Sequence, residues 1–168
     1  GYQVDEALLG QFDRDWEEIT VDIFMGTWCG DSKREVPRFY KILDALSFPE
    51  DHVRLINVDK TPEAYKQSPG HEESGKLIHR VPTFIIYREG KEIGRIVEYP
   101  VTSLEMDLLQ IFEGLPSSPR YKVVHLIDAH LEEHGVPSDD QGLLELARKY
   151  YKEACGDKAL NTYGYYLM

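Results

Sequence analysis

A short apolar run between two helix-like patterns restricts the fold more than any other feature of this sequence. The run, residues 21–26 (VDIFMG), is typical of a buried strand. Apolar residues recur at helical spacing over residues 5–18, and a second helix face follows the run and includes Pro37, a residue that kinks helices. The apolar positions are Leu9, Phe12, Trp16 and Ile19 on the first helix and Val36, Phe39, Tyr40, Leu43 and Leu46 on the second.

Three further strands are expected in the next part of the chain. Residues 53–59 (VRLINVD) alternate as a strand, whereas residues 61–75 are polar and rich in Pro, Gly and Ser, as in a loop. Residues 83–87 (TFIIY) and 92–97 (EIGRIV) are β-rich runs separated by residues 88–91, which predicts a hairpin.

A capping box, Thr102-Ser103-Leu104-Glu105, predicts a helix that reaches about Phe112. The order of elements is then α-β-α-β, a long connection and β-β-α. This order predicts an α/β fold with a central mixed sheet and helices on both of its faces.

A small helical extension follows the first domain. We expect a domain over residues 1–114, a linker over 115–120 and an extension over 121–168. The extension is too short to bury much surface alone, so we expect it to pack on the first domain. Its expected helices span residues 121–134, 139–154 and 158–167.

Composition excludes several classes of function. Nineteen basic against thirty acidic residues give a net charge of −11, which disfavours nucleic acid and anionic membranes as partners. Two cysteines, Cys29 and Cys155, make neither a disulfide framework nor a cysteine-rich metal site. No apolar run approaches the roughly 20 residues that cross a bilayer. No signal peptide is visible. Such a segment can precede Gly1, so the compartment of the protein is left open.

Three motifs in a fixed order make the sequence similar to the thioredoxin family. Trp28-Cys29-Gly30 follows the first strand, Pro37 lies eight residues beyond Cys29, and Val81-Pro82-Thr83 opens the hairpin. The resemblance covers residues 8–114. It is greatest to bacterial thioredoxin-like proteins, cytoplasmic or periplasmic, that carry Trp-Cys-Gly-Asp-Ser in place of Trp-Cys-Gly-Pro-Cys.

The resemblance implies a thioredoxin-like fold with a site around Cys29. It implies a cis peptide bond before Pro82, which would bring Val81 beside Cys29 and leave its backbone free to pair with an extended peptide. Cys29, Ser32 and Pro82 are the catalytic candidates. The candidates for binding a disulfide-bearing or thiol-bearing protein are Trp28, Gly30, Asp31, Val81 and Thr83.

The chemistry expected of Cys29 is that of a single thiol. At a helix N-terminus, free N–H groups and the helix dipole stabilise a thiolate; Lys33 and Arg34 would add to this, and Asp31 would oppose it. Ser32 stands where the family has its second cysteine, and a hydroxyl cannot expel a mixed disulfide. Release then needs an external thiol, such as glutathione, or a substrate thiol, and we expect no metal. A helix-capping role explains Asp31 and Ser32 equally well.

Two departures from the family pattern favour a different way of moving protons. The family commonly has a buried carboxylate on the strand before the motif and a lysine on the next strand, and these places carry Ile23 and Leu55. Asp22 is adjacent, but side chains alternate along a strand, so Asp22 should point to the opposite face.

Three other interpretations stay open. The chain could be a peptide-binding module that kept the groove near Pro82 and lost turnover. The segment 130–134 (HLEEH) matches a zinc-peptidase pattern, although a solvated helix end is the simpler explanation. His71 could act as a base, but its loop has the composition of a solvated insertion, and Cys155 is expected to be a packing thiol.

Overall fold

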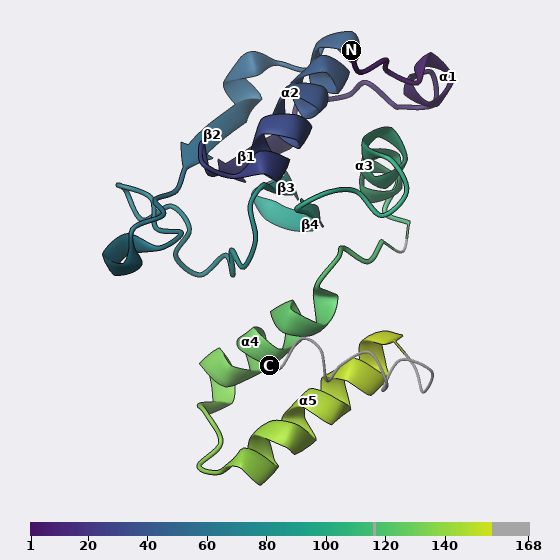
Figure 1. Cartoon of the computed structure of the whole chain (residues 1–168). Helices are drawn as coiled ribbons and strands as arrows, with labels where there is room; N and C mark the ends of the chain where they lie inside the picture. The colour runs from purple at the N-terminus through teal and green to yellow at the C-terminus, as the bar shows by residue number, and fades with distance from the viewer. Residues whose placement is uncertain (116, 156–168) are drawn as a thin grey trace. The chain divides into compact units, whose positions relative to one another are not determined.

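The computed structural model describes residues 1–115 and 117–155, with side chains described to residue 150. The chain forms two compact units, Gly1–Arg120 and Tyr121–Met168 (Figure 1). The end of the predicted linker packs on the first unit, because Arg120 donates a hydrogen bond to the carbonyl of Pro100 at 3.2 Å. No helix in the described part of the chain is long and apolar enough to cross a membrane.

The first unit is built on a four-stranded mixed sheet in the order β2-β1-β3-β4. β1 (Ile19–Met25) runs parallel to β2 (Val53–Asn57) and antiparallel to β3 (Thr83–Arg88). β3 and β4 (Lys91–Val97) form the predicted hairpin. Its two turn residues both have left-handed backbones, and Gly90 (φ 74°) adopts this conformation without steric cost. The expected mixed sheet is therefore confirmed.

Two helices cover one face of the sheet. α2 (Gly30–Ala45) continues through Pro37 and contributes Phe39, whose ring stacks on Phe84 of β3 at 4.3 Å between centroids. α3 (Leu104–Phe112) adds Leu108, which is fully buried. This face holds the larger of two hydrophobic clusters. Packing in this cluster positions α2, which begins after the short turn that follows β1.

The opposite face is covered by the long connection between β2 and β3, for which a loop was predicted. A smaller cluster joins Phe24, Ile56 and Ile85 of the strands to Val58 and Val81, which bound the long connection between β2 and β3. That connection contains only a short 3-10 turn, Pro62–Ala64, in agreement with its polar, Pro- and Gly-rich sequence. The prediction of helices on both faces is corrected for this unit.

The predicted first helix is much shorter than its apolar spacing suggested. α1 spans only Glu6–Leu9: Asp5 accepts a hydrogen bond from the N–H of Leu8 at 3.1 Å, and Gly10 is the C-cap. Asp15 then forms a local turn by accepting from the N–H of Glu17. The four apolar residues are nevertheless all buried, so their spacing reflects a chain that winds across the core.

The predicted capping box is displaced by one residue. Ser103 is the N-cap of α3 and accepts from the N–H of Met106 at 3.1 Å. Glu105 is buried and accepts from the hydroxyl of Tyr2 at 2.8 Å and from the N–H of Asp5 at 3.2 Å. Its carboxylate therefore anchors the N-terminal segment instead of capping its own helix.

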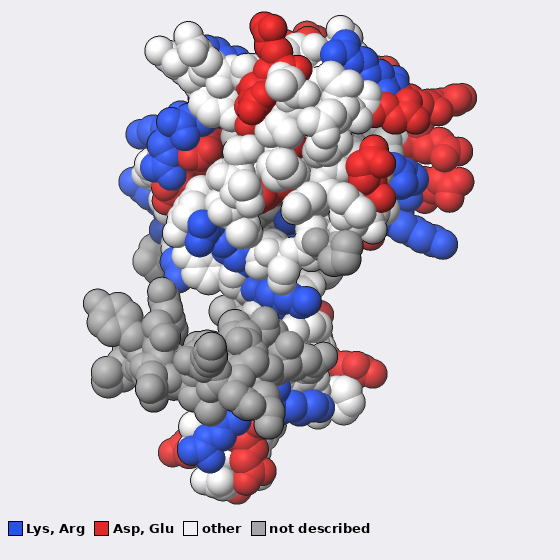
Figure 2. Space-filling view, turned by 90° about the vertical axis from the view of Figure 1, so that its right-hand side faces the viewer, with Lys and Arg blue, Asp and Glu red and all other residues white. Residues whose placement is uncertain are grey.

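Charged side chains of both signs are spread over the surface. On the face shown in Figure 2, basic side chains lie in small groups among acidic and uncharged ones. This face therefore carries no broad basic surface, in keeping with the net charge of −11.

The second unit is a helical hairpin of α4 (Lys122–His134) and α5 (Asp140–Cys155). Both helices were predicted, and the third, expected at 158–167, lies outside the described residues. Among the described side chains of this unit only Leu146 and Ala147 are buried. Val124, Val136, Leu143 and Leu144 are exposed. Packing of this unit on the first domain stays a prediction.

We predict that removing residues 117–168 lowers the melting temperature or the solubility of the protein. Two helices with so few buried side chains cannot form a core, so their apolar faces need another surface to cover them. Calorimetry and binding of a hydrophobic dye, compared between the full chain and residues 1–116, measure this. Unchanged melting with no gain in dye binding would show that residues 117–168 form an independent tail.

Candidate functional site

Cys29 lies at the N-terminus of α2, immediately after the turn that follows β1. It is the N-cap residue (φ −85°, ψ 128°), and its carbonyl accepts the first helical hydrogen bond from Lys33 N–H at 3.1 Å. No side chain caps this helix end. The half-buried thiol therefore lies where free N–H groups and the positive end of the helix dipole stabilise a negative charge.

The structure brings Cys29 and Val81 together, as the resemblance implied. The thiol donates a hydrogen bond to the carbonyl oxygen of Val81 at 3.1 Å, and the Val81–Pro82 peptide bond is cis. Pro82 is buried, and its carbonyl accepts from the N–H of Glu98 at 2.7 Å. Thr83 is also buried and donates to the carbonyl of Arg80 at 2.7 Å, so its hydroxyl faces the protein.

Ser32 holds the turn between β1 and α2. Its side chain is fully buried, and its hydroxyl oxygen accepts from the N–H of Gly26 at 3.3 Å. Gly26 has no room for a side chain, because a Cβ there would lie 2.6 Å from the ring of Trp28. Ser32 therefore does not cap the helix; it fixes the turn that carries Trp28 and Cys29.

The charges on the first turns of α2 are largely neutralised by one another. Arg34 contacts Asp31 at 2.6 Å and the buried carboxylate of Glu35 at 2.6 Å. The guanidinium of Arg34, expected to support the thiolate, is therefore engaged by two carboxylates. Gly30 is exposed, and a Cβ there would meet nothing within 4 Å, so the helix start beside the thiol is open.

Trp28 and the long loop border a hollow of about 570 Å³ next to the motif. The indole N–H donates to the carbonyl of Val58 at 3.3 Å, and the ring lies 6.1 Å from that of Tyr65. His71 lies on the rim of this hollow, is exposed, and contacts Glu73 at 3.4 Å. It has the solvated position that we expected of its loop.

An ion cluster around the buried carboxylate of Asp22 lies on the loop-covered face of the sheet. Asp22 is 2% exposed and accepts two hydrogen bonds from Arg54 at 2.7 Å and one from Lys76 at 2.8 Å. Ile23 instead packs in the larger core, which confirms that Asp22 points to the other face. Leu55 is 44% exposed.

Sequence reasoning missed both cationic partners of Asp22. Arg54 could have been found, because Asp22 and Arg54 are direct partners in the parallel pairing of β1 with β2. Lys76 comes from the loop, whose course no periodic pattern reveals.

A second lysine of the loop, Lys66, was also missed. Its ammonium donates to the carbonyl of His79, two residues before Val81. Burial and the charge of Arg80 lower the pKa of Lys66, whereas Glu98 and Cys29 act to raise it. The side chain is thus anchored two residues from the carbonyl that accepts the hydrogen bond of the thiol.

The zinc-peptidase interpretation of residues 130–134 is not supported. The hydroxyl of Tyr150 lies 3.0 Å from Nδ1 of His130, and the rings of His130 and His134 stack at 4.2 Å. Nδ1 of His134 lies 3.2 Å from the carbonyl oxygen of His130. In the described part of the chain, no three His, Cys, Asp or Glu side chains are placed to hold a metal ion.

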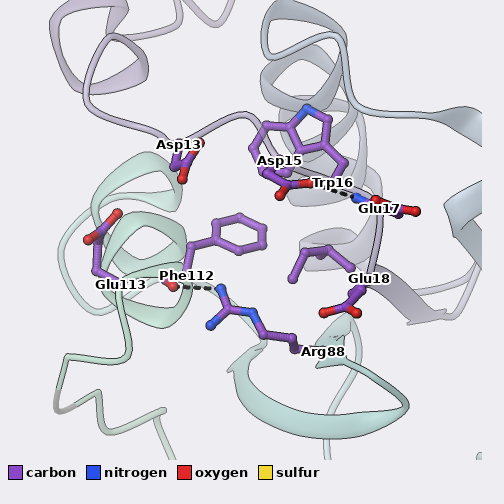
Figure 3. Close-up of a pocket in the computed structure, with 9 residues that line it drawn as sticks. Asp13, Asp15, Trp16, Glu17, Glu18, Arg88, Phe112 and Glu113 are labelled. Carbon is purple, nitrogen blue, oxygen red and sulfur yellow. Dashed lines mark hydrogen bonds between the residues drawn. The ribbon is translucent and has the colours of Figure 1, made fainter.

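Another hollow, of about 450 Å³, lies at the opposite end of β1 from Cys29 (Figure 3). Arg88 extends into it and donates to the carbonyl of Phe112 at 2.8 Å. Its rim is acidic and includes Asp13, Asp15, Glu18 and Glu113. The thiol and this hollow are therefore separate features of the unit.

No model of a known protein family matches the sequence, but individual proteins do. Over 79 residues the chain is 32% identical to a thioredoxin of Chlamydia trachomatis, a match that covers 47% of this chain and 67% of that protein. It is 29% identical over 115 residues to Thioredoxin H9 of Arabidopsis thaliana, covering 67% of this chain and 72% of that protein. It is 28% identical over 89 residues to mitochondrial Thioredoxin-3 of Saccharomyces cerevisiae, covering 53% of this chain and 61% of that protein. The chain therefore belongs to the thioredoxin family, and its first unit has the thioredoxin-like α/β fold.

We predict that Cys29 reacts faster than Cys155 with iodoacetamide at neutral pH. The reason is its place at an uncapped helix N-terminus, whereas Cys155 is the last residue of α5 and lacks this stabilisation of a thiolate. The single-thiol variants Cys155→Ser and Cys29→Ser isolate the two rates, which mass spectrometry follows across pH. Equal or faster labelling of Cys155 would contradict an activated Cys29.

We predict that Asp22→Asn lowers the free energy of unfolding by about 1–3 kcal/mol at pH 7. The value is smaller than for a fully buried ion pair, because the side chain of Arg54 is 61% exposed. Burial alone would raise the pKa of Asp22, but Arg54 and Lys76 outweigh it and lower the pKa.

The pH dependence of this stability difference follows from the lowered pKa of Asp22. A carboxyl with a lowered pKa in the folded state stabilises the fold above its unfolded value of about 3.9, and this stabilisation is lost as the pH falls through the folded value. Urea unfolding from pH 7 to pH 2 should therefore show the two proteins converging in acid. Asp13→Asn, at an exposed position, is the control and should differ little from the natural protein. A constant difference at all pH values would contradict this account.

Proposed function

We propose that this protein carries out thiol-disulfide exchange through Cys29 as its single nucleophile. The observation that carries the proposal is the pairing of two features. A half-exposed thiol lies at an uncapped helix N-terminus 3.1 Å from the Val81 carbonyl, and a buried serine occupies the position of the second thiol. Membership of the thioredoxin family supports the same chemistry.

The reaction proceeds by thiol-disulfide exchanges that conserve electrons. The Cys29 thiolate attacks one sulfur of a substrate disulfide, forms a mixed disulfide, and releases the other sulfur as a thiolate that takes a proton from water. In an isomerisation, a thiol of the substrate attacks the substrate sulfur of the mixed disulfide, forms a new substrate disulfide and releases Cys29. In a reduction, one molecule of an external thiol such as glutathione attacks the Cys29 sulfur and releases the reduced substrate, and a second molecule then attacks the glutathione sulfur, leaves as oxidised glutathione and restores Cys29. These exchanges use thiols alone.

The bound substrate in this proposal is a protein segment that carries a disulfide or a thiol. Trp28, Gly30 and Asp31 border the thiol on the side of α2, and Val81 with Pro82 borders it on the side of β3. When the thiol loses its proton, the Val81 carbonyl loses its donor and becomes free to accept from the backbone of an extended peptide. The hydroxyl of Thr83 donates to the Arg80 carbonyl, so in this proposal it supports the turn.

A binding module without turnover is the second candidate. Ile23 and Leu55 favour it, because one is buried in the core and the other is an exposed apolar side chain, and neither can move a proton. Thiol reactivity separates the two: a module does not require a reactive Cys29, whereas the exchange reaction does.

We predict that Ser32→Cys gives the protein a reversible disulfide between Cys29 and the introduced thiol, and raises its dithiol-dependent reduction of a model disulfide. The two positions are the N-cap and the third residue of α2, and residues three apart in a helical turn fall within the Cα separation of about 4.4–6.8 Å that a disulfide needs. Mass spectrometry under oxidising conditions and a coupled reductase assay measure both effects.

Ser32→Ala is the matched control, because it removes the hydrogen bond from Gly26 without adding a thiol. Its turnover should not rise. If the natural protein already reduces the substrate as fast as Ser32→Cys, the single-thiol proposal is wrong and Cys155 becomes the candidate second thiol.

A further inference from the structure

The hydrogen bond of the thiol creates an electrostatic problem when Cys29 ionises. In the neutral state the S–H group donates to the Val81 carbonyl at 3.1 Å. Once the proton leaves to solvent, a negative sulfur faces the negative end of a carbonyl dipole across the same distance. The N-terminus of α2 offsets part of this repulsion, but Arg34 is bound to Asp31 and Glu35. A cation on the side of Val81 would offset more of this repulsion.

Lys66 is held on that side by the loop. The segment around it closes on itself, since Lys66 N–H donates to the Asp59 carbonyl and Asp59 N–H donates to the Gln67 carbonyl, both at 2.9 Å. The backbone of Lys66 is left-handed (φ 58°), which turns the chain at this point. Its half-buried ammonium then donates to the His79 carbonyl, two residues before Val81.

The Lys66 ammonium lies among several charges and 4.9 Å from the centroid of the Tyr65 ring. Arg80 and Glu98 act on it in opposite directions, and the thiol of Cys29 acts in the same direction as Glu98. An ammonium has three donors, so the bond to His79 leaves two for other acceptors. The other charged groups near the thiol lie at the start of α2: Asp31 is paired with Arg34, and Lys33 is exposed.

We propose that Lys66 is the electrostatic partner of the Cys29 thiolate: its ammonium, anchored on the His79 carbonyl, stabilises the anion that forms when the thiol releases the Val81 carbonyl. The long loop thereby supplies a charge that Ile23 and Leu55 do not provide. Lys66 acts through the thiolate and is a positioning residue. The proposal rests on the proposed function only in taking Cys29 as the reacting group.

The test compares Lys66→Met with Lys66→Arg in a Cys155→Ser background, where Cys29 is the single thiol. Iodoacetamide is neutral, so its reaction rate reports the thiolate fraction and not attraction of the reagent. We expect Lys66→Met to slow alkylation at pH 7 by about three- to tenfold and to displace the pH profile upward, as for the loss of one partly screened opposite charge. Lys66→Arg keeps the charge and should stay within about twofold of the natural rate.

Lys60→Met is the matched control, because Lys60 lies in the same loop and is exposed. It should leave the profile unchanged. An unchanged profile in Lys66→Met, or an equal loss in Lys66→Arg and Lys66→Met, would overturn the proposal. Circular dichroism checks that each variant is folded, and Lys66→Gln replaces Lys66→Met if the latter unfolds.

The test of Lys66 and the test of the proposed function can fail independently of each other. Formation of mixed disulfides with an oxidised peptide tests the function directly; loss of Lys66 should slow this reaction without abolishing it. If Cys29 forms none in any variant, the exchange reaction is wrong, while a Lys66-dependent alkylation profile would still establish the electrostatic partnership.

Discussion

The hydrogen bond from the Cys29 thiol to the Val81 carbonyl joins two segments that are 52 residues apart in the chain. It requires that α2 begin directly after β1 and that the chain enter β3 through a cis peptide bond before Pro82. The two faces of the sheet are stabilised by different kinds of interaction. Phe39 and Phe84 fix the helix face by stacking, whereas the loop face is held by ion pairs and hydrogen bonds around Asp22.

The candidate reactive position can be located in the sequence because the residues that define it are local. Trp28, Cys29 and Ser32 lie in one short segment at the start of a helix, and the Val81-Pro82-Thr83 motif marks the opposite wall. The buried strands and the hairpin are equally clear, since apolar alternation and a Gly-containing turn depend on nearby residues. Ser32 is a candidate from the sequence alone, but its hydrogen-bond partner, Gly26, is seen only in the folded turn.

What sequence reasoning could not supply depends on contacts between distant residues. Lys66 and Lys76 reach their partners because of the path of an irregular loop, and irregular backbone has no period to detect. The prediction of a long first helix was wrong for the opposite reason, because a local pattern was present and misleading. Its apolar spacing is helical, but the cap at Asp5, the end at Gly10 and the turn at Asp15 determine the local structure.

The connection between β2 and β3 is tied down at several points by side chains that bond to its backbone. Arg95 on β4, 6% exposed, donates to the carbonyls of Lys76 and Leu77, as Lys66 does to His79. The stretch between Gln67 and Lys76 lies between these anchors and contributes no strand to the sheet. The backbone that presents the sulfur is therefore fixed by these anchors and not by the stretch between them.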